Sequence, residues 1–258
     1  MGSSLRNISA IAGKELRSFY SSPIAWVMLG LFALIFGWFF FAALGYFARA
    51  SMAGAMGGPQ RMNVNQDMLR PLLSNATVLI LFLIPMVTMR TYSEEKRSGT
   101  IELLLTSPLK DIEIILGKFV GAMGMYLGML AVTLVYLGIV FYFGNPAIKP
   151  LLSGYLGLVL FGGGFVAMGL FISSLTGNQM VAAAASFVVF LLFWIISWLG
   201  ESMGPTAASI LSYLSITEHF EDFGKGVIDT KHVVFYLSFI AFGLFLATKS
   251  VDTDRWRG

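Results

Sequence analysis

The stretch Ile24–Phe47 reads IAWVMLGLFALIFGWFFFAALGYF and contains no charged residue. A membrane-spanning helix needs about 20 apolar residues, because the hydrocarbon core is roughly 30 Å thick and a helix rises about 1.5 Å per residue. The stretch therefore predicts a helix that crosses a bilayer. It is too long for the apolar core of a signal peptide, and no small-residue cleavage site follows closely, so we expect it to stay in the mature protein.

Further apolar segments follow along the chain. The least clear of them is Leu72–Met89, because it contains Pro85. Inside a membrane each span must be a helix, since unpaired backbone groups find no water there. We expect six spans, at residues 24–47, 72–89, 119–143, 151–175, 180–199 and 233–248. The sequence thus predicts an all-α polytopic membrane protein with a single transmembrane domain over residues 1–258.

The composition supports this fold class and excludes others. Of the 258 residues, 57% are hydrophobic and 12% are charged, and the mean hydropathy is +0.78. Soluble proteins average roughly 25% charged residues, so a soluble domain, a disordered tail and a nucleic-acid binder are all disfavoured. The sequence has 0 Cys, which excludes a disulfide framework and a thiolate metal site.

The positions of Lys and Arg predict the orientation. Six spans place both termini on one side of the membrane. Basic residues concentrate before the first span, between the second and third spans, and after the last span, and fewer lie in the other connections. Because basic residues are retained on the cytoplasmic side, we expect both termini to be cytoplasmic and the chain to lie in the cytoplasmic (inner) membrane.

The segment before the first span has the pattern of an amphipathic helix, with basic residues opposite an apolar stripe. The stripe consists of Leu5, Ile8, Ala12, Leu16 and Phe19. This pattern is typical of an interfacial helix on the inner leaflet. The alternative is that the basic residues serve only as a topological anchor. Pro23 then favours a bend into the first span.

Two further features concern packing. Residues 201–231 are expected to form two short amphipathic helices in or near the outer leaflet. Glycines recur on one face of the third span, at Gly117, Gly121, Gly124 and Gly128. Such a stripe lets another helix approach closely, as GxxxG pairs do, although ordinary packing within the bundle is the preferred explanation for most of these glycines.

The residues needed for several kinds of chemistry are missing. Most of the spans contain no ionisable residue, which argues against a proton-coupled carrier or pump. The two histidines, His219 and His232, do not form an HExxH motif, and Gly117-Lys118 is followed by Phe119 and not by the Ser or Thr of a phosphate-binding loop. We therefore predict that the chain is not an enzyme and has no catalytic, cofactor-binding or metal site.

The most informative segment is the cytoplasmic stretch Arg90–Lys118, RTYSEEKRSGTIELLLTSPLKDIEIILGK. It begins with a charge cluster, breaks at Ser98-Gly99, and breaks again before Pro108, which suits the first position of a following helix. These breaks predict a short helix between two turns, in a position where a soluble partner can push or pull it. The alternative is a solvated loop that serves topology only.

This segment resembles a known family. YSEEKRSGTIELLLTSPL, followed by Gly117-Lys118, is similar to the cytoplasmic loop of ABC type-2 transporter permeases, and Tyr213–Ser238 is similar to permeases of the gliding-motility ABC exporter. The resemblance implies a dimer with a second permease copy or homologue, and a separate ABC ATPase subunit that binds ATP and Mg and docks on a coupling helix in this loop. Carried over by position, the ATPase contacts are Glu94, Glu95, Lys96, Arg97, Gly99, Thr100 and Glu102.

The resemblance also implies a function. We expect a permease subunit of an exporter that moves a hydrophobic, amphiphilic or lipid-linked substrate, with membrane lipids and no nucleic acid among its partners. The alternative is a structural membrane subunit that anchors an ATPase in an envelope or motility machine without moving cargo. A reconstituted complex that hydrolyses ATP but moves no substrate would favour the anchor.

Overall fold

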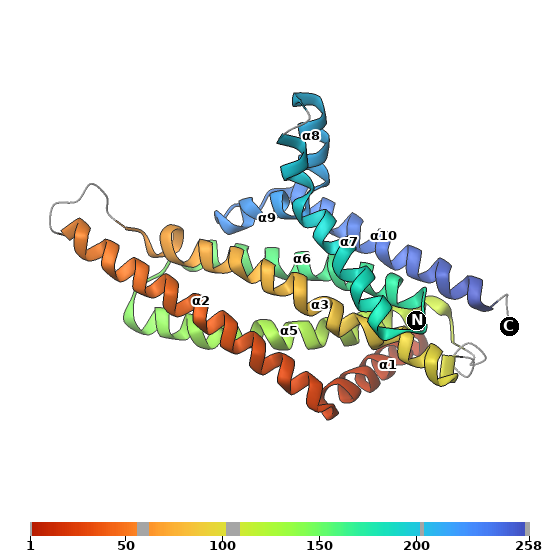
Figure 1. The fold of residues 1–258 in the computed structure, drawn as a ribbon. Coiled ribbons are helices and arrows are strands. Elements are labelled where there is room, and N and C mark those ends of the chain that lie inside the picture. The colour runs from red at the N-terminus through yellow and green to blue at the C-terminus, as the bar shows by residue number, and fades with distance from the viewer. Residues whose placement is uncertain (1, 56–61, 102–108, 202–203, 256–258) are drawn as a thin grey trace.

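The structure is a computed structural model that describes residues 2–55, 62–101, 109–201 and 204–255. Six of its helices are long and apolar enough to cross a membrane (Figure 1). They are α2 (Pro23–Ala55), α3 (Arg70–Ser98), α5 (Asp111–Phe143), α6 (Ile148–Ser174), α7 (Gln179–Glu201) and α10 (Thr230–Arg255). The predictions of an all-α fold and six spans are confirmed, including the span that contains Pro85.

The remaining helices are shorter. They are α1 (Gly2–Ser21), the π-helical turn η1 (Val64–Leu69) that leads into α3, α8 (Pro205–Leu214) and α9 (Ile216–Gly224). The start of α1, the end of α3 and the end of α10 lie at the same end of the bundle, which we name the terminal end (Figure 1). The last part of α7 and α8 project together away from the other spans.

Several helices continue beyond the apolar segments that predicted them. Helix α3 runs past Met89 to Ser98, and α5 begins at Asp111, well before Phe119. Hydropathy marks only the part of a helix that suits the membrane, whereas the helix itself continues until a residue breaks it. For α3 that residue is Gly99, whose φ of 72° is a left-handed conformation that glycine adopts without steric cost.

Helix α6 is the central helix, and 83% of its most apolar stretch is buried. Its small residues let neighbouring side chains reach its backbone. A Cβ at Gly162 would collide with the ring of Tyr126 from α5, and that tyrosine donates a hydrogen bond of 2.6 Å to the carbonyl of Leu158. Phe165 stacks on Phe190 of α7 with ring centroids 4.3 Å apart. Helices α5 and α7 therefore pack closely against α6.

Helix α1 packs against α5 along the bundle. Its apolar stripe faces the bundle in part, since Ala12 and Phe19 are buried while Leu5 is 69% exposed. Ser22 separates α1 from α2, and Pro23 begins α2, as expected for a bend at this position. The amphipathic pattern indicated a helix with two faces, but it did not indicate that the bundle covers one of them.

Candidate functional site

The predicted ATPase contacts lie at the terminal end of α3. The charge cluster was expected in a loop, but Arg90–Ser98 continue the helix of the second span. The helix ends at Gly99, whose N–H donates to the carbonyl of Lys96. The break predicted at Ser98-Gly99 is therefore present, and the charged side chains before it are held on a rigid helix.

The predicted residues differ in exposure. Glu94, Arg97, Gly99 and Thr100 are exposed, whereas Glu95 and Lys96 are half-buried. The hydroxyl groups of Ser98 and Thr100 lie 2.8 Å apart across the break. Glu102 and the remainder of the expected coupling helix lie outside the described residues. The side chains available to a partner in the described part of the site are thus those of Glu94, Arg97 and Thr100.

Glu95 turns inward and takes part in an ion cluster around the buried Lys118, with the exposed Lys14 at its edge. Its two carboxylate oxygens lie 2.9 Å from Nζ of Lys118 and 3.3 Å from Nζ of Lys14. Lys118, on α5, is 1% exposed and also pairs with Glu15 of α1 at 3.0 Å. Its ammonium donates a further bond of 2.8 Å to the carbonyl of Thr91. The cluster joins α1, α3 and α5 just behind the exposed charges.

The environment of Lys118 satisfies a buried cation. Glu15 and the carbonyl of Thr91 accept hydrogen bonds from its ammonium, and Glu95 adds an ion pair at 2.9 Å. Nζ also lies 4.9 Å from the centre of the Tyr92 ring. A buried charge is tolerated only when it is paired and hydrogen-bonded in this way. The expectation that spans lack ionisable groups holds for the segment from Phe119, but α5 carries a buried charge directly before it.

The predicted glycine stripe on α5 forms the groove in which α1 lies. A Cβ at Gly117 would come within 2.6 Å of Ile11, one at Gly121 within 2.5 Å of Glu15, and one at Gly124 within 2.6 Å of Leu16. At Gly128 an added Cβ would collide with the hydroxyl of Tyr20. This close approach of α1 brings Glu15 to Lys118, so the stripe and the ion cluster depend on each other.

A second buried polar contact joins α3 to α6. The backbone N–H groups of Tyr92 and Ser93 donate to the hydroxyl of Ser173, at 3.1 and 3.2 Å. The Ser173 hydroxyl in turn donates to the carbonyl of Met89 at 3.0 Å. Ser93 and Ser173 are both fully buried. The terminal end of α3 is therefore joined to α1, α5 and α6 by hydrogen bonds and ion pairs.

Comparison of the sequence with known protein families shows to which family the chain belongs. Residues 9–246 match the family described as ABC-2 family transporter protein. The chain belongs to this ABC-2 transporter family. No curated protein matches the chain. The narrower similarity to gliding-motility exporter permeases stays a prediction.

Lys118 is the residue of this ABC-2 permease that sequence reasoning missed as part of the site. The motif included Gly117-Lys118, but Glu15 is distant along the chain, and no local pattern shows that the two meet. A usable signal was a lysine directly before the uncharged stretch that begins at Phe119, since an unpaired ammonium is costly among apolar residues. That cost predicts a carboxylate partner, although not which one.

At the opposite end of the permease the two histidines meet. Nδ1 of His219 and Nδ1 of His232 lie 2.6 Å apart, and Nε2 of His232 lies 2.8 Å from Oδ2 of Asp222. Nε2 of His219 lies 2.9 Å from the carbonyl of Tyr213. Among the described residues no group of three His, Cys, Asp or Glu side chains could hold a metal ion. The histidine pair therefore joins α8, α9 and α10 by hydrogen bonds.

The two groups at the ends of this chain of contacts are hydrogen-bond acceptors. The carbonyl of Tyr213 needs an N–H from His219, and the carboxylate of Asp222 needs one from His232. Burial lowers the pKa of His219 below its ordinary value, and the hydrogen bond from His232 lowers the pKa of Asp222. The lowered pKa favours the neutral form of His219, with its Nε2–H directed at the carbonyl of Tyr213.

We expect the stability of the permease to decrease more steeply, as the pH is lowered, when His219 is present than when it is replaced. Because its folded-state pKa is depressed, its contribution is present above the unfolded value of about 6.5 and is lost as pH falls through the folded value. One proton gives at most about 1.4 kcal/mol per pH unit. The measurement is thermal unfolding in detergent between about pH 7 and pH 5, compared with His219→Gln, which has no titrating ring. Identical slopes for the two proteins would contradict the assignment.

Proposed function

We propose that this chain is the transmembrane permease subunit of an ABC transporter, in which a separate ATPase subunit supplies the energy. The observation that carries the proposal is the exposed charged end of α3, which is bonded through buried polar contacts to three other helices. A partner that pushes on Glu94 and Arg97 therefore moves a connected unit. ATP and Mg bind on that partner.

The proposed orientation places the terminal end in the cytoplasm and the chain in the inner membrane. Basic residues of α1 and of the last parts of α3 and α10 lie at this end. Retention of Lys and Arg on the cytoplasmic side supports the orientation. Both termini and the proposed ATPase contacts then face the compartment that contains ATP.

In the proposed mechanism, two permeases form a dimer and each docks one ATPase. Closure of the ATPases on ATP moves the ends of the two α3 helices together. Because Lys118 joins α3 to α1 and α5, and Ser173 joins it to α6, these helices move with it. The motion opens a path between the permeases towards the outer side.

The proposed cargo is hydrophobic, amphiphilic or lipid-linked, and the proposed direction is export. Ionisable side chains of the described spans lie near helix ends, as Arg49, Lys118 and Lys249 do. The middle of the spans offers apolar and aromatic surface, which suits an apolar cargo better than a small ion. Transport of a labelled amphiphile by the reconstituted complex tests this part of the proposal.

Reversing the charges of the proposed docking surface, Glu94 and Arg97, should weaken ATPase binding without reducing the amount of permease. The double variant Glu94→Lys with Arg97→Glu reverses both exposed charges, and hydrogen bonds to charged groups contribute about 1.5–3 kcal/mol each. We expect co-purification of the ATPase to fall by about tenfold or more, with the permease level in the membrane unchanged. ATPase pull-down and permease-stimulated ATP hydrolysis measure the effect.

Two comparisons make this test specific. Lys249→Glu reverses an exposed charge on α10, near the terminal end of the bundle, and should leave co-purification of the ATPase unchanged. Glu95→Lys should reduce the amount of folded permease, because Glu95 contacts Lys118 and Lys14 inside the protein. If the ATPase binds the double variant as well as the parent, the docking assignment is wrong.

A further inference from the structure

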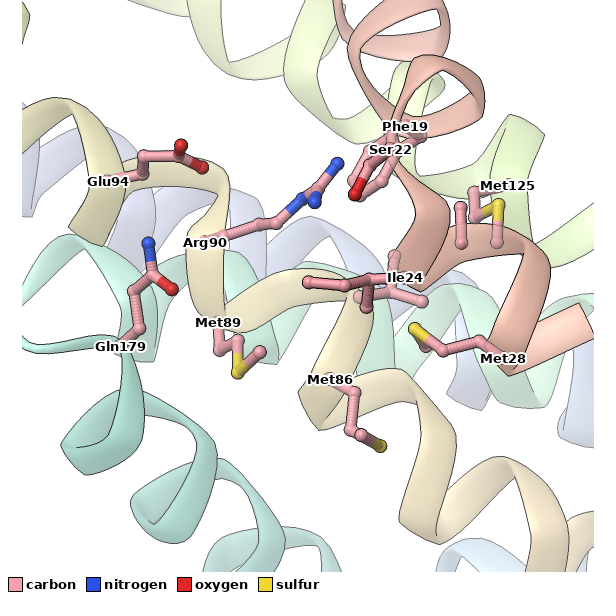
Figure 2. Close-up of a pocket in the computed structure, with 12 residues that line it drawn as sticks. Phe19, Ser22, Ile24, Met28, Met86, Met89, Arg90, Glu94, Met125 and Gln179 are labelled. Atoms are coloured by element: carbon pink, nitrogen blue, oxygen red, sulfur yellow. The ribbon is translucent and has the colours of Figure 1, made fainter. Parts of the chain in front are cut away.

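A pocket of about 230 Å³ lies beside the terminal end of α3 (Figure 2). Its walls come from the bend between α1 and α2, from α3, from the first residue of α7, and from Met125 of α5. The pocket lies where the spans meet the terminal end, which the proposed orientation places at the cytoplasmic surface of the membrane.

The pocket has an apolar wall and a polar wall. Methionines dominate the apolar wall, with Met28, Met86, Met89 and Met125 gathered on one side of Arg90 (Figure 2). Methionine is unbranched and polarisable, so a wall of this kind adapts to a flexible chain. The polar wall contains Arg90 and Glu94, which lie one helical turn apart on α3. The pocket therefore offers an apolar wall and a polar wall, which match the two parts of an amphiphilic molecule.

The charges of the polar wall do not neutralise each other. Arg90 and Glu94 form no ion pair with each other, and no carboxylate in the described ranges pairs with Arg90. The guanidinium donates one long bond of 3.3 Å to the carbonyl of Ser18 and lies 4.6 Å from the centre of the Phe19 ring. A guanidinium has five N–H donors in a fork that matches phosphate, so most of its donors remain available.

A second pocket continues on the other side of Arg90. It measures about 210 Å³ and is lined by polar and charged residues, among them Lys14 and Ser18 and the carboxylates Glu15 and Glu95, which pair with Lys118. Arg90 and Glu94 border both pockets. A molecule bound between them can place an apolar chain among the methionines and a polar headgroup beside Arg90 and Glu94.

We propose that this pocket binds a phospholipid with a zwitterionic amine headgroup. The phosphate lies at the guanidinium of Arg90, the ammonium lies at the carboxylate of Glu94, and the first part of one acyl chain lies against the methionines. A purely anionic headgroup would place negative charge beside the carboxylate of Glu94 with no cation between them. Arg90 and Glu94 together therefore favour a phosphate with an adjacent amine. The pocket rests on the proposed orientation of the chain. Glu94 is also a proposed ATPase contact, so the test uses the permease without the ATPase.

The test measures binding of defined lipids to the detergent-purified full chain by native mass spectrometry. The probes are phosphatidylethanolamine and phosphatidylglycerol with identical acyl chains. The parent should bind phosphatidylethanolamine at least several-fold more tightly. Arg90→Gln should reduce binding of both lipids by about tenfold, whereas Glu94→Gln should remove the preference for the amine headgroup.

The controls separate this pocket from general attraction to a basic surface. Arg17→Gln removes an exposed charge of α1 outside both pockets and should change neither affinity. Met86→Phe narrows the apolar wall and should weaken both lipids without altering the polar wall, which keeps the test valid if Arg90→Gln folds poorly. Equal binding of the two lipids by the parent, or unchanged binding by both Arg90→Gln and Met86→Phe, would overturn the proposal.

Discussion

Lys118→Met is expected to destabilise the permease by about 3–5 kcal/mol, the range found when one partner of a buried ion pair is removed. The change leaves Glu15 and Glu95 close together without the ammonium between them, and it leaves the carbonyl of Thr91 without its donor. Methionine keeps much of the volume, so the loss reports charge and not a cavity. Thermal unfolding in detergent measures it.

A matched lysine provides the control for this prediction. Lys231 pairs with Asp229 at 3.2 Å, but its side chain is 61% exposed. Exposed ion pairs contribute about 0–1 kcal/mol, so Lys231→Met should be nearly neutral. The triple variant Lys118→Met with Glu15→Gln and Glu95→Gln removes the uncompensated charges and should recover part of the loss. Similar melting temperatures for Lys118→Met and Lys231→Met would show that the cluster is unimportant for stability.

Destabilisation alone does not show that the cluster transmits force, so a second readout is needed. The triple variant keeps the exposed charges of Glu94 and Arg97 and should still bind the ATPase. If the cluster joins α3 to α1 and α5 during the cycle, ATP hydrolysis in this variant should proceed with reduced transport. Transport per ATP hydrolysed equal to that of the parent would assign the cluster to stability only.

The six spans were predictable because the membrane imposes length and apolarity on every segment that crosses it. The extent of the helices was not, since α3 continues to Ser98 through residues that are polar and charged. Hydropathy carries no signal for such an extension. Gly99 carried one, because a glycine after a helical segment commonly adopts the left-handed conformation that ends a helix.

Contacts between distant residues account for what the sequence did not reveal about the site. Glu94 and Glu95 are adjacent and look equivalent, yet successive residues on a helix point about 100° apart, so one faces outward and the other contacts Lys118. The histidines show the same limit. His219 and His232 form no sequence motif, yet the turn between α9 and α10 brings their rings within hydrogen-bond distance.

Gly121→Leu is expected to displace α1 from its groove, because even the first carbon of the new side chain would lie 2.5 Å from Cβ of Glu15. Overpacking of this kind costs about 1–3 kcal/mol. Leucine is a better helix former than glycine, so any loss comes from the collision and not from the helix itself. The measurement is cross-linking of Asn7→Cys to Glu113→Cys, which replaces a contact of 3.0 Å between α1 and α5 in a chain with 0 Cys.

Gly138 supplies the control on the same helix, because an added Cβ there would meet nothing within 4 Å. Gly138→Leu should leave the cross-linking yield at the parental level, whereas Gly121→Leu should reduce it several-fold. Since Glu15 moves with α1, Gly121→Leu should also remove one of the two carboxylates from Lys118. Combining it with Glu15→Gln should therefore cost less than the sum of the two changes, because residues in one network do not act independently. Full additivity would mean that the groove and the ion cluster are separate features.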